Sequence, residues 1–235
     1  MQKIKSKINK TFIYQFESFF HLKSINDVIR VDFDDDKFVS KSLDFISNSS
    51  SEFIEIINFN SRPSVVPSIY FDEDLKYKYL ITNTVSLKTI LSDTSYDKKI
   101  KIVYSISDKL NEILEKSKLE YSHNNYFTYL YDFIENRNAE TNGFSFFVNL
   151  NYKSFDIIIF NNDEFIFFNS FNVNDENEFL YYLFFVLKNY EGSNKKDKIT
   201  FLGKFERFEN YYNIASKYSE IDFIGYNNNS SESHE

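Results

Sequence analysis

The chain has 235 residues and a formal net charge of −8 at pH 7, and it contains no cysteine. Disulfides, thiolate metal ligands and cysteine nucleophiles are therefore excluded, and the negative charge argues against a nucleic-acid surface, which needs clustered Lys and Arg. With 28 Phe, 18 Tyr and only four Gly, the sequence favours an aromatic core and offers few residues for a glycine-lined phosphate loop.

The amino-terminal segment is basic but lacks the continuous apolar stretch of a signal peptide. The longest apolar run, residues 179–187, is nine residues long and too short to span a bilayer. We therefore expect a cytoplasmic protein without membrane insertion.

The first half of the chain alternates strand-like and helix-like segments. The strand-like segments are residues 11–20, 28–33, 53–59 and 100–106, and helices are predicted over 37–46, over 107–114 with Ser107 as the cap, and over 126–135. Residues 63–74 hold both prolines of the chain, which predicts a turn or connection rather than a central strand. The polar stretch 136–143 ends in glycine, so we place the end of a first lobe at residue 142.

The second half has a clearer order. Three strand-like runs, 144–151, 154–160 and 164–171, are separated by two and three residues, which predicts consecutive antiparallel hairpins. A helix after Asn174, a strand at 198–202, a helix at 207–217 and a strand at 221–224 follow. In the first of these helices we expect Leu183 and Phe184 to be buried against the sheet. The second lobe thus covers 143–226, before a polar tail at 227–235 that we expect to be disordered.

This β-β-β-α-β-α-β order predicts a mixed five-stranded sheet, because the last two strands must return through helices and so run parallel. The same order is the repeating unit of ribonuclease-H-like and actin-like proteins. The predicted fold class is accordingly α/β, an actin-like (ribonuclease-H-like) fold of two lobes.

Four sequence phrases carry a more specific resemblance. They are PSVVPSIYFDED (63–74), FSFFVNLNYKSFDIIIFNNDEFIFFNSF (144–171), ENEFLYYLFFVL (176–187) and FLGKFERFENYYNIASKY (201–218). In these phrases the chain resembles an uncharacterised bacterial family (a domain of unknown function) with the actin-like ATPase fold. The resemblance covers roughly residues 60–225 and implies the two-lobed fold without implying an activity.

More distantly, the second half is similar to pilus-assembly and cell-division actin homologues, whose first hairpin carries the phosphate-binding pattern Asp-x-Gly-x-Gly-Thr-Thr-Asp. This similarity implies that Asn149 replaces the carboxylate that organises magnesium. Asn151 and Lys153 replace the two glycines that let backbone N–H groups approach the phosphates. Ser154 stands for one threonine, and Asp156 is unchanged. These five residues form a degenerate phosphate loop.

The same homologues receive adenosine at a pair of glycines, of which this chain keeps Gly203 and replaces the partner with Lys204. Gly203 is therefore a degenerate adenosine-site candidate, although a glycine needed for the turn from strand to helix is the favoured explanation. The histidines lack metal-ligand spacing, and we expect neither a metal nor a cofactor.

The leading interpretation is a non-catalytic, pseudo-ATPase protein that acts by binding a protein partner. Two alternatives stay open at this point: an ATP-binding or weakly hydrolysing protein that uses Ser154, Asp156 and Gly203, or a binder of another small ligand between the lobes. Fold analogy does not choose among them.

Overall fold

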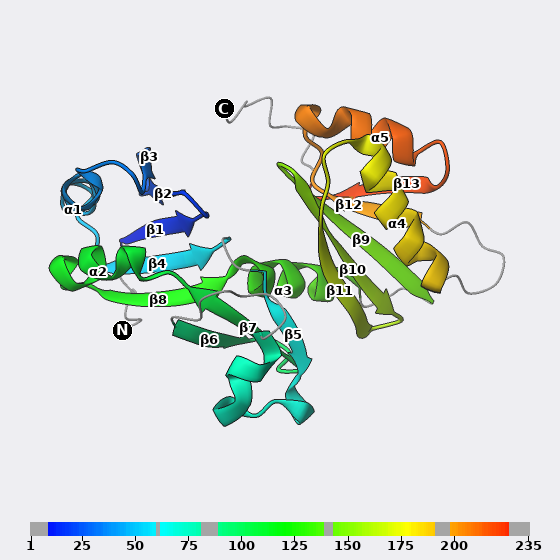
Figure 1. Cartoon of the computed structure of the whole chain (residues 1–235), viewed down its shortest axis with the longest axis horizontal. Coiled ribbons are helices and arrows are strands. Elements are labelled where there is room, and N and C mark those ends of the chain that lie inside the picture. The colour runs from blue at the N-terminus through cyan, green and yellow to red at the C-terminus, as the bar shows by residue number, and fades with distance from the viewer. Residues whose placement is uncertain (1–8, 60–61, 81–88, 139–142, 191–197, 226–235) are drawn as a thin grey trace, which may run out of the picture. The chain divides into compact units, whose positions relative to one another are not determined.

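The computed structural model describes residues 9–59, 62–80, 89–138, 143–190 and 198–225 (Figure 1). Contacts within the chain divide it into two compact units, Met1–Phe133 and Ile134–Glu235. This division falls inside helix α3 (Tyr126–Asn138). The lobes assigned from the sequence, 1–142 and 143–226, divide the chain after that helix and stay a prediction, and the predicted tail at 227–235 lies outside the described residues.

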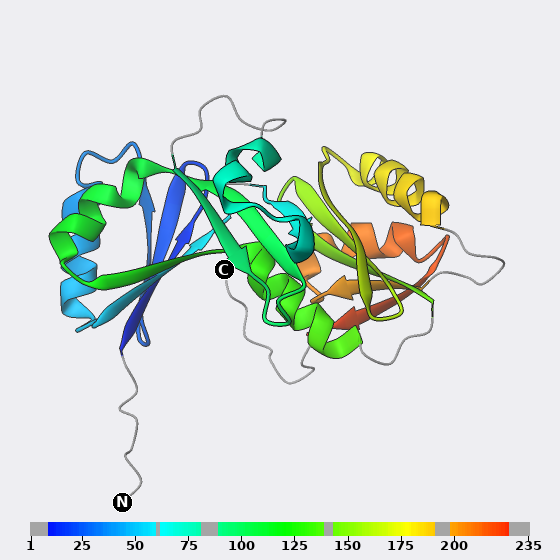
Figure 2. The same cartoon turned by 90° about the horizontal axis from the view of Figure 1, so that it is seen from below.

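The first unit contains a five-stranded mixed sheet in the order β3-β2-β1-β4-β8. Its strands are β1 (Lys10–Gln15), β2 (Phe19–Lys23), β3 (Val28–Asp32), β4 (Phe53–Asn58) and β8 (Glu120–Asn125). The pairs β1–β2 and β2–β3 are antiparallel, whereas β4 runs parallel to both β1 and β8. Helices α1 (Phe38–Asn48) and α2 (Asn111–Ser117) cover one face of the sheet (Figure 2), where Ile46, Ile113 and Leu114 join the strand residues Ile13 and Ile56 in one core.

A second, three-stranded sheet is inserted in this unit between β4 and α2. It has the order β5-β7-β6, with β5 (Ser64–Pro67), β6 (Thr89–Thr94) and β7 (Ile100–Ile106). Short 3₁₀ helices accompany it: η1 (Ser68–Tyr70), η2 (Glu73–Leu80) and η3 (Asp108–Leu110). The predicted strand 100–106 is confirmed as the central β7, and β6 was not predicted. The proline segment does not supply a central strand, as expected, but Ser64–Pro67 form an edge strand, where a missing N–H is tolerated.

The second unit confirms the predicted β-β-β-α-β-α-β order. Its elements are β9 (Phe144–Asn151), β10 (Ser154–Asn161), β11 (Glu164–Asn172), α4 (Glu176–Tyr190), β12 (Lys198–Leu202), the 3₁₀ turn η4 (Glu206–Phe208), α5 (Glu209–Ala215) and β13 (Glu220–Ile224). The sheet order is β11-β10-β9-β12-β13, and β12 is parallel to both β9 and β13.

The core of the second unit lies between this sheet and the helices α4 and α5 (Figure 1). Alternate residues of β9 and β10 point into it, including the fully buried Val148 and Phe155. From α4, Phe179 and Leu183 are also fully buried, whereas Phe184 is only partly buried and contacts Tyr218. The expectation for Leu183 is confirmed, and that for Phe184 is confirmed only in part, because its ring packs against this core but stays partly exposed.

The two five-stranded sheets share one topology. In each, a three-stranded antiparallel meander leads through a helix to a strand parallel to the first, and then through a second helix to an outer parallel strand. The three-stranded sheet interrupts this plan in the first unit alone. Two copies of one unit in a single chain are what the actin-like prediction requires.

Candidate functional site

The hairpin of β9 and β10 brings the degenerate phosphate-loop residues together. The antiparallel register places Asp156 opposite Asn149 and Ser154 opposite Asn151. Because side chains alternate across a strand, these four point away from the face on which Val148, Phe155 and the helices form the core. Three of the four also share hydrogen bonds, as the sequence pattern alone could not show.

The carboxylate of Asp156 is the centre of this polar group. Its side chain is fully buried, and its Oδ2 accepts hydrogen bonds from Asn149 Nδ2 at 2.9 Å and from Asn151 Nδ2 at 3.2 Å. The two amides at the predicted phosphate-loop positions thus donate to a neighbouring carboxylate. A phosphate would need the same donors, and it would meet a buried negative charge.

Lys153 occupies the turn between the two strands with a φ of 123°, a conformation that glycine adopts far more easily. Its N–H donates to the carbonyl oxygen of Asn151 at 3.1 Å, and its own carbonyl accepts from the N–H of Val173 at 3.0 Å. The side chain is exposed, with Nζ 5.6 Å from the centroid of the Tyr152 ring. The turn therefore has a backbone shape suited to glycine, but it presents a lysine side chain.

Gly203 follows β12 at a φ of 81°, and its N–H donates to the carbonyl oxygen of Ile224 at 2.8 Å. A Cβ at this position would lie 2.6 Å from Cε2 of Phe205. The hydroxyl of Tyr212 closes the turn by accepting from the N–H of Phe205 at 3.2 Å. The local structure thus explains the glycine at position 203, because both its positive φ and the nearby ring of Phe205 favour a residue without a side chain.

A second buried polar group, which the sequence reasoning missed, lies in the first unit. Gln15, Asn58 and Asn125 end β1, β4 and β8, stand side by side in the register, and are all fully buried. Asn58 Nδ2 donates to the carbonyl oxygen of Ser105 at 3.2 Å, and Asn125 Oδ1 accepts from the N–H of Phe127 at 3.0 Å, which caps α3. Both side-chain amide atoms of Gln15 lack a hydrogen-bond partner among the described residues. The one signal in the sequence is that each of these strands ends in an amide.

A partly buried carboxylate, Asp93, links the inserted sheet to the start of α3. Its Oδ2 accepts from the N–H of Asn125 at 2.7 Å and from Thr128 Oγ1 at 2.6 Å, and its Oδ1 accepts from Tyr104 Oη at 2.9 Å. Burial raises the pKa of Asp93 above its ordinary value, against the opposing effect of these hydrogen bonds, and burial also raises the pKa of Tyr104. A carboxylate that accepts three hydrogen bonds from the protein has a structural role and is not available as a base.

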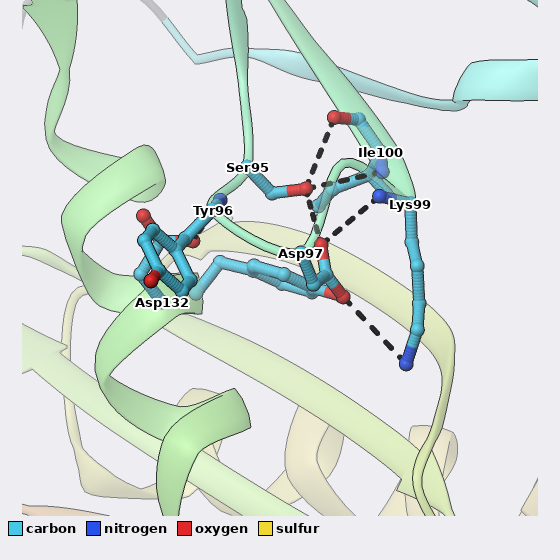
Figure 3. A network of polar contacts seen from close by, with 7 residues as sticks. Ser95, Tyr96, Asp97, Lys99, Ile100 and Asp132 are labelled. Carbon is cyan, nitrogen blue, oxygen red and sulfur yellow. Dashed lines mark hydrogen bonds and ion pairs between the residues drawn. The ribbon is translucent and has the colours of Figure 1, made fainter.

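The hairpin between β6 and β7 makes a further polar network against α3 (Figure 3). Asp97 Oδ1 accepts from the hydroxyl of Ser95 at 2.6 Å and from the N–H of Lys99 at 3.0 Å. The N–H of Tyr96 donates to Asp132 Oδ1 at 2.9 Å, and Tyr131 Oη donates to Asp97 Oδ2 at 3.0 Å. These bonds hold a tight turn in place.

Among the described residues, no group of three or more His, Asp and Glu side chains is arranged to hold a metal ion. His123 lies in β8, mostly buried, and burial lowers its pKa to about 4. The described helices include none that is long and apolar enough to cross a bilayer.

Solved structures with similar folds support the assignment of architecture. The chain is similar to a Bacteroides thetaiotaomicron VPI-5482 protein with actin-like ATPase fold and unknown function, with a TM-score of 0.74 and 16% identity over 95% of this chain and 93% of that one. It is also similar to a chain of the PilM–PilN type IV pilus biogenesis complex, with a TM-score of 0.57 and 9% identity over 92% and 88% of the two chains. The protein has the actin-like ATPase fold.

Sequence comparison extends this to a family. A search of curated proteins finds no match. The model of the family described as "Protein of unknown function (DUF3822)" matches residues 41–221, which is most of the chain. The chain therefore belongs to the DUF3822 family.

Proposed function

We propose that this protein is a non-catalytic member of the actin-like fold that acts by binding a protein partner. The observation that carries the proposal is the closed polar group in the β9–β10 hairpin, where Asn149 and Asn151 both donate to the buried carboxylate of Asp156. The pattern of the catalytic relatives needs a carboxylate and two glycines at positions 149, 151 and 153 of this chain. Here all three are replaced.

Charge and geometry both argue against a phosphate in this hairpin. Lys153 brings a positive charge to the turn of this hairpin, but its side chain hinders the close approach of the turn's backbone to a phosphate. The buried carboxylate of Asp156 opposes an anion, and its oxygen already takes the two amide donors. The alternative, an ATP-binding site, would use Gly203. The conformation of the turn already explains why glycine occupies this position.

Partner binding is supported by analogy with a protein of the same fold, since the PilM–PilN structure is a complex of two proteins. The setting that we propose is the cytoplasm, because a chain without cysteine needs no oxidising compartment. No nucleic acid is proposed as the partner, given the net charge of −8.

The test is a thermal melt with and without Mg-ATP, combined with an assay for phosphate release. A site with micromolar affinity would be more than about 100-fold saturated in millimolar Mg-ATP, which stabilises a fold by about 2.7 kcal/mol or more. In a chain of this size that raises the melting temperature by about 5–10 °C.

We expect no such shift and no phosphate release. A rise of about 5 °C or more with Mg-ATP, absent with ATP alone, contradicts the proposal and favours a remodelled ATP site. In that event Asp156→Ala, if it folds and loses the shift, locates the nucleotide at this hairpin.

A further inference from the structure

Helix α4 presents two aromatic rings on the side that faces away from the core. Tyr181 and Phe185 are 64% and 58% exposed, and their rings stack at 6.3 Å between centroids. The buried residues of the helix belong to the core of the second unit: Phe179, Leu183, Val186 and Leu187. Among the described α-helices, no other exposes more than half of two large hydrophobic side chains. Adjacent exposed rings of this kind are typical of a contact surface.

A charged residue flanks the rings at each end of the helix. Glu178 lies three residues before Tyr181, and Lys188 lies three residues after Phe185. The four positions therefore follow one another at intervals of three, four and three residues, which is the spacing of a seam between paired helices. Glu178 accepts hydrogen bonds from the N–H and the side-chain amide of Asn174, at 2.9 and 3.0 Å. Within the described part of the chain, neither Glu178 nor Lys188 has an ion-pair partner.

The order acid, ring, ring, base is its own complement when the helix direction is reversed. In an antiparallel pair of α4 helices, Glu178 of one copy lies opposite Lys188 of the other at both ends. Tyr181 lies opposite Phe185 in the same way, so the four rings meet at the centre. A parallel pair would place like charges opposite each other and is disfavoured. The antiparallel arrangement is that of an isologous, two-fold dimer.

The other charges near the stripe keep this polarity. Asp175 and Glu176 add negative charge beside Glu178 at the amino-terminal end of α4. Lys153 adjoins the same end, because its carbonyl oxygen accepts from the N–H of Val173 at 3.0 Å. Three acidic residues outweigh this single lysine, so the end remains negative. It therefore attracts the base at the other end of a second helix.

We propose that α4 forms an antiparallel contact with α4 of a second copy of this chain, with Tyr181 and Phe185 at its centre and ion pairs between Glu178 and Lys188 at both ends. Removal of the rings from water gives affinity, and the ion pairs fix direction and register. A different protein would need the reverse order of charges and rings, whereas a second copy has it by symmetry. The inference goes beyond the proposed function and does not depend on it.

The contact should be weak. The helix has 15 residues and is thus about 22 Å long. One such pair of helices covers less than the roughly 800 Å² per partner of a standard interface, so we expect a dissociation constant of about 10–100 μM. Sedimentation velocity of the full chain between about 5 μM and 1 mM should therefore show monomer converting to dimer.

Substitutions at exposed aromatic residues test the centre of the contact. Phe185→Asp should weaken the dimer about tenfold or more, because it buries a charge between the rings. Tyr70→Asp is the matched control, since this aromatic side chain is 73% exposed in the first unit, and it should leave the dimer unchanged. A parent chain that stays monomeric overturns the inference and leaves the stripe to a different protein. Equal association of Phe185→Asp, or growth beyond two copies, also overturns it.

Charge reversal tests the direction of the helices. Glu178→Lys and Lys188→Glu should each weaken self-association about tenfold or more, whereas an equal mixture of the two should associate at least as well as the parent, because every end again pairs acid with base. Lys98→Glu, at an exposed lysine of the first unit, is the control and should associate like the parent. Circular dichroism melts establish that the variants fold, since Glu178→Lys loses the hydrogen bonds from Asn174.

A mixture of folded variants that stays monomeric would contradict the antiparallel contact. If Glu178→Lys does not fold, Lys188→Glu compared with Lys98→Glu still decides, because equal association of these two would also contradict it. The Mg-ATP melt of the parent protein tests the proposed function separately, so either can fail without the other.

Discussion

Asn149 Nδ2 lies 2.9 Å from Asp156 Oδ2, and this hydrogen bond joins the two positions at which catalytic relatives have carboxylates in the first hairpin of this unit. An amide and a carboxylate form a satisfied pair, while two carboxylates at this distance would repel each other unless a cation or a proton lay between them. Under the proposed degenerate phosphate loop, the amide at position 149 lets the folded state hold Asp156 through a hydrogen bond rather than through a metal ion.

The first prediction follows from this pair. Asn149→Asp should lower the free energy of unfolding at pH 7 by about 2–4 kcal/mol, because it places a second, partly buried carboxylate beside the buried carboxylate of Asp156. Part of the loss should return below about pH 5, where one carboxyl takes up a proton. Asn149→Ala, which only removes a hydrogen bond, should cost about 1 kcal/mol at both pH values. Urea denaturation of the three proteins provides the measurement.

Magnesium gives this experiment a second outcome. We expect excess MgCl2 to leave the unfolding midpoint of Asn149→Asp unchanged, because the amide of Asn151 still donates to Asp156 and the turn still carries Lys153. If MgCl2 raised the unfolding midpoint of Asn149→Asp but not that of Asn149→Ala, one substitution would have restored a cation site. The hairpin would then be a metal site that lacks a single ligand.

The turn at Lys153 yields the second prediction. At a φ of 123° a side chain is strained by about 1–3 kcal/mol, and glycine removes this strain at an entropic cost of about 0.5–1 kcal/mol. Lys153→Gly should therefore stabilise the protein by about 1 kcal/mol and raise its melting temperature by about 2–4 °C. Lys153→Ala is the control, since it removes the charge and keeps the Cβ. A gain in Lys153→Ala equal to that of glycine would assign the effect to charge.

How far the sequence predicts this fold depends on the kind of link between elements. The links at Tyr152–Lys153 and Asn161–Asp163 are short and polar, so the β9–β10–β11 meander was predicted with its bounds nearly correct. The sequence instead predicts one strand-like segment over residues 11–20, where the structure has the two strands β1 and β2. Their turn at Phe16–Ser18 has no Gly, Pro or Asn, although the N–H of Phe16 donates to the carbonyl oxygen of Phe19 at 2.9 Å and closes a hairpin.

The candidate site residues also differ in how far the sequence predicts them. Asn149 and Asp156 are seven residues apart on one predicted hairpin, and the resemblance to the phosphate-binding pattern names both residues, whereas their position on one face and their hydrogen bond come from the structure. Gln15, Asn58 and Asn125 are far apart in the sequence and meet only because β4 lies between β1 and β8. A local pattern does not encode that order, and the buried amide row was therefore missed.

The third prediction concerns acid. Burial lowers the pKa of His123 to about 4 from an ordinary value of 6.5. As the pH falls from about 6.5 to about 4, the unfolded chain takes up a proton that the folded chain does not, so His123 lowers stability over this range and has no such effect above it. The loss is at most about 3 kcal/mol and smaller where solvent reaches the ring. The melting temperature of His123→Leu should fall less between pH 6.5 and pH 4 than that of the parent protein. Parallel pH profiles for the two proteins would contradict this.

The last prediction separates the inner and outer aromatic residues of α4. The ring of Phe179 is fully buried and contacts Phe155 at 4.9 Å and Tyr211 at 5.2 Å, so Phe179→Ala should cost about 3–5 kcal/mol in the free energy of unfolding. Phe185 lies two turns further along on the exposed side, and Phe185→Ala should change stability by no more than about 0.5 kcal/mol.

Together the two substitutions distinguish a ring that holds the core from a ring that is available to a partner. A cost above about 1.5 kcal/mol for Phe185→Ala would mean that its stacking on Tyr181 stabilises the fold. A neutral Phe185→Ala would mean that the exposed ring contributes little to the fold and is available for contacts outside the chain. Circular dichroism melts of the two variants and the parent protein decide between these outcomes.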